Sequence, residues 1–140
     1  MTLYENKLTA KDFCDLQEAV GFGRPNLSQI KTALENSIYI VSAEVDGKIV
    51  GMGRLVGDYA RIFYIQDVFI SPNYQRQGIG TAIMKKLLSY IKDLNLVDCN
   101  IMVGLMSAKG KEDFYKRFGF KVRPNDFQGC GMMMNIEKHH

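Results

Sequence analysis

The stretch "SPNYQRQGIGTAIMKKLL", residues 71–88, decides how this chain folds. It opens with a proline turn and passes through two glycines, Gly78 and Gly80, that are separated by one residue. Beyond them, apolar residues recur every three or four positions and the lysines fall on other faces. This pattern predicts an amphipathic helix from about residue 78 to residue 94. Glycines at the start of a helix indicate that backbone amides come close to a neighbouring group.

That neighbouring group is either a phosphate or another element of the fold. The first N–H groups of a helix have no intrahelical acceptor, and the helix dipole places positive potential there. Gly78 and Gly80 would let a pyrophosphate reach those amides, and Arg76 could add a charge-assisted contact. The loop is not a Walker loop, because no lysine follows Gly80, and Ile83 replaces the last glycine of a dinucleotide fingerprint. The alternative is that both glycines merely allow close packing of the helix on a sheet.

Periodicity, turn dipeptides and β-branched runs predict the other elements. Asp46-Gly47, for example, supplies the positive φ angles of a tight hairpin turn between two strands. The predicted helices cover residues 10–20, 28–34, 78–94 and 111–118; the predicted strands flank Asp46-Gly47 and cover residues 61–70, 100–105, 120–122 and 131–137. We therefore expect an α/β chain (residues 1–140, one domain) with a central, mostly antiparallel mixed sheet flanked by helices.

Composition limits the classes of protein to consider. A chain of 140 residues that is 46% hydrophobic and 24% charged suits one soluble domain. The net charge of +3 is spread along the chain, which disfavours a nucleic-acid-binding protein. No apolar run is long enough for a membrane span and the start lacks a signal-peptide core, so a cytoplasmic location is expected. Cys14, Cys99 and Cys130 lack CxxC spacing and are expected to be buried, reduced thiols.

Two motifs carry a resemblance to a known family. The segment "QDVFISPNYQRQGIGTAIMKKLL" resembles motif A of the GNAT superfamily of acyl-CoA-dependent N-acetyltransferases, Q/R-x-x-G-x-G/A, with Gln75, Gly78 and Gly80 at its defining positions. Further on, "FYKRFGF" (114–120) resembles motif B of the same family. The likeness covers the chain from about residue 38 to residue 134. It implies a GNAT-like fold in which two parallel strands, here 62–70 and 99–105, splay apart to hold CoA.

The resemblance also implies how acetyl-CoA would be bound, with no metal. Amides at the start of the glycine-containing helix would hold the pyrophosphate. Backbone groups of the preceding strand would hold the pantetheine arm, and one amide there would polarise the thioester carbonyl as an oxyanion-type donor. The cofactor-binding residues implied are Val68, Phe69, Ile70, Gln75, Arg76, Gln77, Gly78, Ile79, Gly80 and Thr81.

Two residues match catalytic positions of the family. Tyr115 would be the general acid that protonates the departing CoA thiolate, since a phenol with a pKa of ~10 is a plausible donor; the alternative is an ordinary core tyrosine. Several relatives carry Glu-Asp before motif A, and this chain has Gln66-Asp67. Asp67 could accept the proton of the amine or hold an ammonium substrate, or an ordered water chain could carry the proton. A structural carboxylate near a strand bulge is an equally good interpretation of Asp67.

The resemblance implies acetyl transfer to a primary amine of a small molecule or peptide by direct attack. It allows a homodimer and gives no reason to expect a nucleic-acid or membrane partner. The alternative is a CoA-binding module or sensor with weakened catalysis, because Gln66 replaces an acidic residue and Ala108 replaces an asparagine common in relatives. The acceptor remains open, and its candidate contacts are Arg24, Arg54, Asp58 and Arg123, each of which could equally form a surface salt bridge or a turn.

Overall fold

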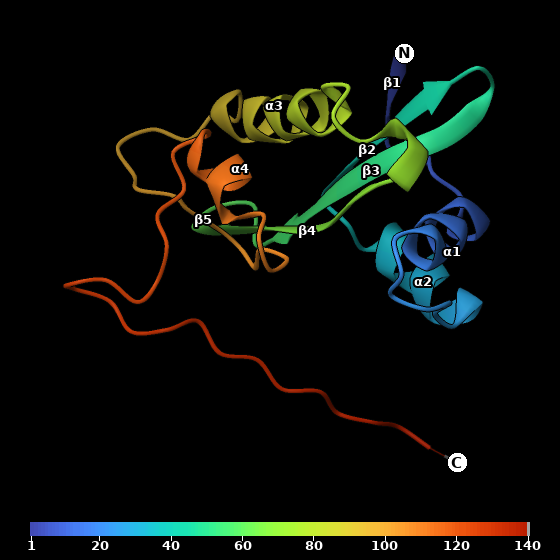
Figure 1. Ribbon diagram of the computed structural model, residues 1–140. Coiled ribbons are helices and arrows are strands. Elements are labelled where there is room, and N and C mark those ends of the chain that lie inside the picture. Colours follow the sequence, from blue (N-terminus) through green and yellow to red (C-terminus); the bar gives the residue numbers. More distant parts are fainter. Residues whose placement is uncertain (140) are drawn as a thin grey trace. The chain divides into compact units, whose positions relative to one another are not determined.

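Five strands form one mixed sheet in the order in which they follow along the chain (Figure 1). Neighbouring strands pair antiparallel from the first to the fourth, and the fifth is parallel to the fourth. They are β1 (Thr2–Glu5), β2 (Tyr39–Val45), β3 (Lys48–Gly57), β4 (Ile62–Ile70) and β5 (Met102–Leu105). The predicted sheet is confirmed, and β1 is an addition that the sequence pattern did not indicate.

The computed structural model describes residues 1–139. The chain divides into two units, one ending at Leu105 and the other beginning at Met106. The first unit holds the whole sheet, the short 3-10 helix η1 (Pro72–Tyr74) and three α-helices: α1 (Ala10–Ala19), α2 (Leu27–Glu35) and α3 (Ile79–Lys92). None of the helices in the described part of the chain is long and apolar enough to cross a membrane.

The helices begin where the sequence offers caps. The Thr9 hydroxyl accepts a hydrogen bond from the Asp12 amide at 3.1 Å and so caps α1. The Asn26 side chain caps α2 in the same way, accepting from the Gln29 amide at 2.8 Å. Helix α3 differs because its N-cap is Gly78, which has no side chain to offer. The first amides of α3 therefore remain available to another acceptor.

Alternate residues of β3 face opposite sides of the sheet, which carry different helices (Figure 1). On one side, a Cβ at Gly53 would lie 2.9 Å from Ile83 Cγ2 and 3.0 Å from Leu87 Cδ1, so α3 packs directly on the β3 backbone. On the other side, Met52 packs into an apolar cluster with residues of α1 and α2, among them Phe13. The glycines of β3 thus set how closely α3 approaches the sheet.

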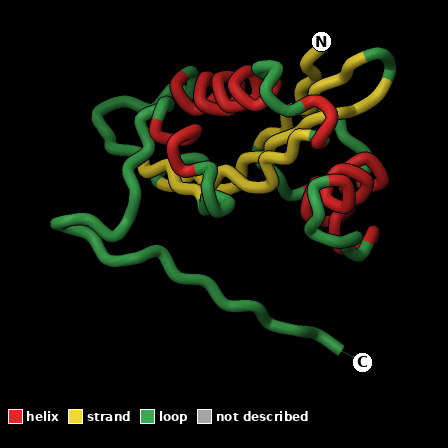
Figure 2. Tube along the Cα trace, viewed as in Figure 1, coloured by secondary structure: helices red, strands yellow, loops and turns green. Residues whose placement is uncertain are grey.

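The second unit contains α4 (Glu112–Lys116) and no strand among its described residues. The chain beyond α4 is drawn as loop as far as residue 139 (Figure 2). The predicted strands at 120–122 and 131–137 are therefore wrong. Their apolar side chains have neither a partner strand nor a core to pack against: Met132, for instance, is 88% exposed.

The cysteines only partly match the expectation. Cys14 is buried on α1, and its thiol lies 3.8 Å from the Pro25 carbonyl oxygen. Cys99 and Cys130 are free and exposed, so the expectation of buried thiols is wrong for these two. Both lie outside regular elements, where no apolar layer covers them.

Candidate functional site

Strand β4 loses its parallel partner halfway along its length. The pairing with β5 runs from Ile62 opposite Met102 to Ile65 opposite Leu105. From Gln66 to Ile70, no strand among residues 1–139 pairs with the edge of β4 that faces away from β3. Backbone groups on this edge are available to a ligand. The opening agrees with the predicted separation of two parallel strands.

A β-bulge lies where β4 separates from β5. The register with β3 shifts between Arg54, which lies opposite Gln66, and Met52, which lies opposite Phe69. Asp67 and Val68 therefore face a single residue of β3. Asp67 has a φ of +56°, a left-handed conformation that aspartate adopts more readily than most residues. A bulge bends and twists its strand, which accounts for the end of the pairing with β5.

The Asp67 carboxylate is held by neighbouring side chains. Arg54 Nε donates to Asp67 Oδ2 at 2.7 Å, and Gln66 Nε2 donates to Asp67 Oδ1 at 3.3 Å. Arg54 Nη1 also donates to Ser37 Oγ at 3.2 Å. The side chains of Arg54 and Asp67 are only 16% and 13% exposed. Both carboxylate oxygens of Asp67 thus have partners within the protein.

The loop between β4 and α3 is held at its two ends. The Ser71 amide donates to the Val50 carbonyl at 2.8 Å, and Gln75 Nε2 donates to the Ile70 carbonyl at 3.1 Å. Arg76 and Gly78 have φ angles of +64° and +83°. The left-handed backbone at Arg76 and Gly78 turns the chain into the first residue of α3. The Gln75 side chain holds the loop against the end of β4.

The amides from Arg76 to Thr81 donate to no acceptor within residues 1–139, since the first bond at the start of α3 runs from the Ala82 amide to the Gly78 carbonyl. A Cβ at Gly78 would meet no atom within 4 Å, so Gly78 does not serve close packing. Free amides, the helix dipole and open space above Gly78 suit a phosphate or pyrophosphate group. No group of three His, Cys, Asp or Glu residues that could hold a metal occurs among the described residues.

Tyr115 lies on α4, in the second unit. Its ring contacts those of Phe114 and Phe120, with centroids 5.0 Å and 6.3 Å away. Burial raises the pKa of the Tyr115 phenol above its usual value. The phenol therefore keeps its proton throughout the neutral range. Its role as the general acid stays a prediction.

Two of the candidate contacts for the acceptor are engaged locally. Arg24 Nη1 donates to Asp15 Oδ1 at 2.8 Å, and both side chains are about half exposed. Arg123 Nε donates to the Gly129 carbonyl at 2.7 Å within the second unit. These contacts favour the salt-bridge and turn interpretations of the two arginines.

Asp58 shapes the turn that leads into β4. Its Oδ1 accepts hydrogen bonds from the amides of Ala60, Arg61 and Ile62 at 2.8 to 3.0 Å. These backbone bonds lower the pKa of Asp58 to about 2. The turn interpretation is again favoured over a contact with the acceptor.

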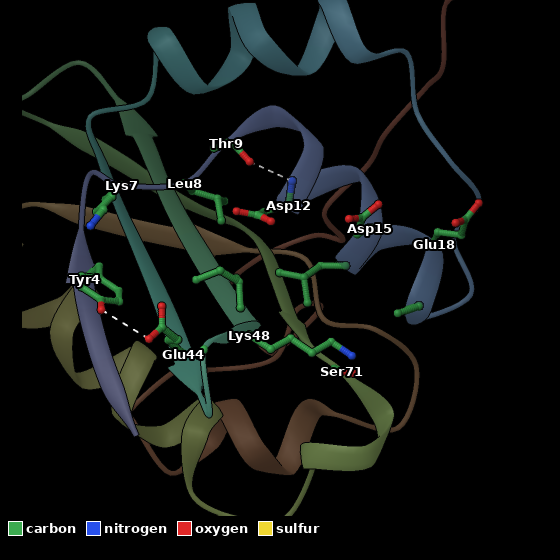
Figure 3. A pocket seen from close by; sticks show the side chains of 14 residues that line it. Tyr4, Lys7, Leu8, Thr9, Asp12, Asp15, Glu18, Glu44, Lys48 and Ser71 are labelled. Carbon is green, nitrogen blue, oxygen red and sulfur yellow. Dashed lines mark hydrogen bonds between the residues drawn. The ribbon is translucent and has the colours of Figure 1, made fainter.

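A separate groove lies between α1, β1 and the turn that joins β2 to β3 (Figure 3). It has a volume of about 710 Å³ and does not include the β4 edge or the amides that precede α3. Carboxylates from α1 and β2 surround it together with two lysines: Asp12, Asp15, Glu18, Glu44, Lys7 and Lys48. No sequence pattern indicates this groove, because its walls come from segments far apart in the chain.

Comparison with known proteins finds acetyltransferases both by sequence and by structure. Residues 8–120 match the sequence model of the "Acetyltransferase (GNAT) family". A solved structure of a GNAT family protein from Streptococcus pneumoniae is 30% identical, with a TM-score of 0.78 and 99% of this chain and 98% of that chain covered. A probable acetyltransferase from meticillin-resistant Staphylococcus aureus is 27% identical, with a TM-score of 0.86 and 96% and 98% covered.

Among curated proteins, the chain resembles the chloroplastic GCN5-related N-acetyltransferase 2 of Arabidopsis thaliana. The two are 28% identical over 141 residues, which cover 84% of this chain and 53% of the relative. The chain spans about half the length of this relative and of two acetyltransferases from Glycine max that it also matches.

Proposed function

Because this chain belongs to the GNAT acetyltransferase family, whose model matches residues 8–120, we propose that it transfers an acetyl group from acetyl-CoA to a primary amine of a small molecule or peptide. One observation carries the proposal. The unpartnered amides from Arg76 to Thr81 begin α3, directly after the loop that follows the open edge of β4. This combination offers an anion site and a strand-like edge to one elongated ligand.

The residues predicted to hold acetyl-CoA fall into two groups. The amides from Arg76 to Thr81 bind the pyrophosphate, and the Arg76 guanidinium adds a charge-assisted hydrogen bond. Gln75 supports this loop through its bond to the Ile70 carbonyl. Backbone groups from Val68 to Ile70 hold the pantetheine arm along the open edge of β4.

Acetyl-CoA, when bound, supplies the acetyl group as a thioester. An amide between Val68 and Ile70 donates to the carbonyl oxygen, where negative charge develops during attack by the amine. Tyr115 donates its phenolic proton to the departing sulfur. Water removes the proton of the amine, because both oxygens of Asp67 already accept hydrogen bonds from Arg54 and Gln66. Asp67 remains the second candidate for the base.

The decisive experiment measures release of CoA thiol from acetyl-CoA with a panel of primary amines. We expect turnover by the wild type, and Tyr115→Phe should lower kcat by roughly 10²-fold because the proton donor is lost. Binding of CoA, measured by calorimetry, should be the same in both proteins. Tyr59→Phe is the control, since Tyr59 is 55% exposed and lies on the turn before β4. Tight CoA binding by the wild type with no turnover on any amine would instead identify a CoA-binding module or sensor.

Several wider expectations also belong to this proposal. A cytoplasmic location is one, and the chloroplastic Arabidopsis relative marks the alternative. A homodimer is another, as is the lack of a membrane partner. The small net charge of +3 supports only the further expectation that no nucleic acid is bound. Sedimentation at several protein concentrations would test for the homodimer.

A further inference from the structure

We propose that Arg54 is a positioning residue: by pairing with Asp67 it holds the bulge of β4 in the shape that presents the Val68–Ile70 amides to the acetyl donor. Arg54 and Asp67 then act together as a clamp on the bulge, and neither contacts a substrate. This inference rests on the proposed acetyl transfer. For Asp67 it selects the structural carboxylate among the interpretations that the sequence left open, and for Arg54 it replaces a surface salt bridge with a mostly buried one.

The bulge needs such a clamp because its backbone is unfavourable by itself. A non-glycine residue with a φ of +56° persists only where its surroundings fix it. The clamp meets that need with a 2.7 Å bond from Arg54 Nε to Asp67 Oδ2, between side chains that are mostly buried. Gln66 holds the other oxygen of Asp67.

The clamp is anchored at its far end. Ser37 Oγ accepts from Arg54 Nη1 at 3.2 Å and itself donates to the Ala33 carbonyl at 2.8 Å. Ala33 belongs to the last turn of α2. A continuous chain of hydrogen bonds therefore joins the end of α2 to the bulge of β4. Arg54 links the two, because it donates hydrogen bonds both to Asp67 and to Ser37.

Arginine suits this position better than lysine. Its planar guanidinium presents Nε and Nη1 in fixed directions, one toward Asp67 and one toward Ser37, whereas a lysine has a single nitrogen at the end of a flexible chain. The site is also poorly accessible to water, so the ion pair is weakly screened by salt. Loss of one partner would leave the other charge buried without compensation.

Three variants separate the clamp from the other roles. Arg54→Met removes both hydrogen bonds. Arg54→Lys keeps the positive charge but loses the two donors in fixed directions. Asp67→Asn removes the charge and keeps a residue that tolerates a left-handed backbone. We expect Arg54→Met and Asp67→Asn each to lower kcat by roughly 10- to 100-fold, as for a misplaced catalytic group. The KM for acetyl-CoA should change less than kcat does, because the amides that bind the pyrophosphate are untouched.

The pH dependence distinguishes a clamp from a base. We expect the shape of the kcat/KM–pH profile to be the same in the wild type, Arg54→Met and Asp67→Asn, with only its height lowered. Arg54→Lys should retain more activity than Arg54→Met. If only Asp67→Asn lost activity and its profile lost the acidic limb, Asp67 would be the base and the clamp would be wrong.

A readout without turnover tests the same inference. Amide hydrogen exchange in the pairing of β3 with β4 on either side of the bulge should be faster in Arg54→Met and Asp67→Asn than in the wild type, while exchange in β1 and β2 is unchanged. Lys86→Met is the matched control: it breaks the exposed ion pair of Lys86 with Glu5, whose atoms lie 3.2 Å apart, and should alter neither kcat nor exchange.

The outcomes are distinct. If the wild type binds CoA but transfers no acetyl group, the proposed function fails, and the exchange experiment alone decides whether the clamp exists. If Arg54→Met does not fold, Arg54→Lys and Asp67→Asn give the same comparison. Unchanged kcat together with unchanged exchange in the β3–β4 pairing around the bulge, in the variants that fold, would overturn the clamp.

Discussion

Two aspartates show how much the partners of a side chain decide its role. Asp58 and Asp67 are both polar residues close to or within β4, and both were candidates for chemistry. In the structure Asp58 accepts three backbone amides of its own turn, whereas Asp67 pairs with Arg54, 13 residues earlier in the chain. A local pattern such as Asp58 with the following amides is readable from the sequence. The pairing of Asp67 depends on the register of β3 against β4, which the sequence alone does not determine.

The Asp58 turn predicts a specific pH dependence of stability. The folded pKa of about 2 lies below the usual value of 3.8, so the carboxylate stabilises the fold fully above about pH 4 and loses this effect as the pH falls toward 2. Asp58→Ala should therefore have a lower Tm than the wild type at pH 7, and the difference should shrink on acidification. Asp58→Asn, which keeps an acceptor oxygen, is the control for the loss of charge. A difference in Tm that is the same at pH 7 and pH 2.5 would contradict this account.

Gly78 combines backbone freedom with an open approach to α3. Gly78→Ala should cost about 1–2 kcal/mol of stability, because alanine disfavours a φ of +83°. It should also weaken acetyl-CoA binding roughly 3- to 10-fold, since the added methyl group lies where the pyrophosphate approaches. Gly47→Ala is the matched control, with a φ of +77° and equally open space in the β2–β3 turn. It should show the same loss of stability in denaturant titrations with no change in the calorimetric Kd.

At the scale of the element, helices and strands were predicted correctly where the pattern within one short segment is sufficient to identify them. The apolar period of α3 and the Asp46-Gly47 turn were sufficient to place α3 and the β2–β3 hairpin. The packing between them was not predicted, because it depends on which residues of β3 face α3. The two glycines around Met52 proved to be the contact surface, whereas the glycine at the start of α3 faces open space.

Close packing of α3 on β3 can be tested at Gly53. A Cβ at this position would lie 2.9 Å from Ile83 Cγ2, a stiff β-branched methyl group. We expect Gly53→Ala to cost about 1–3 kcal/mol from overpacking, partly offset by about 0.4–1 kcal/mol from the less flexible unfolded chain. Gly104→Ala on β5 is the control, since its nearest atom, Tyr64 Cδ2, is 3.7 Å away. Equal unfolding free energies for the two variants in urea would show that α3 does not depend on Gly53.

At the scale of the whole molecule, the two units differ in how they are stabilised. Residues 1–105 contain a sheet with apolar layers on both faces, whereas no described residue from 106 onward is fully buried. The sequence indicated final strands because Met and Ile residues recur there. Strands require partners, and partner choice is a property of the whole fold that no local apolar run specifies.

This difference predicts two classes of amide exchange. Amides of β2 and β3, which pair with neighbours on both sides, should exchange only through global opening. Amides from residue 106 onward, including those of α4, should exchange orders of magnitude faster because local opening costs little. Hydrogen–deuterium exchange followed by mass spectrometry resolves the two classes. Uniform protection along the chain would show that the second unit shares the cooperativity of the first.

The bulge at Asp67 has a further consequence, which concerns aggregation. An unpaired strand edge is a template on which a strand of another molecule can add, and straight edges carry the greatest risk. The left-handed backbone at Asp67 interrupts the regular row of donors and acceptors along the open half of β4. A foreign strand could therefore pair in register with only a few residues before meeting the bend. The irregular backbone of β4 thus also opposes the addition of a strand from another molecule to this edge.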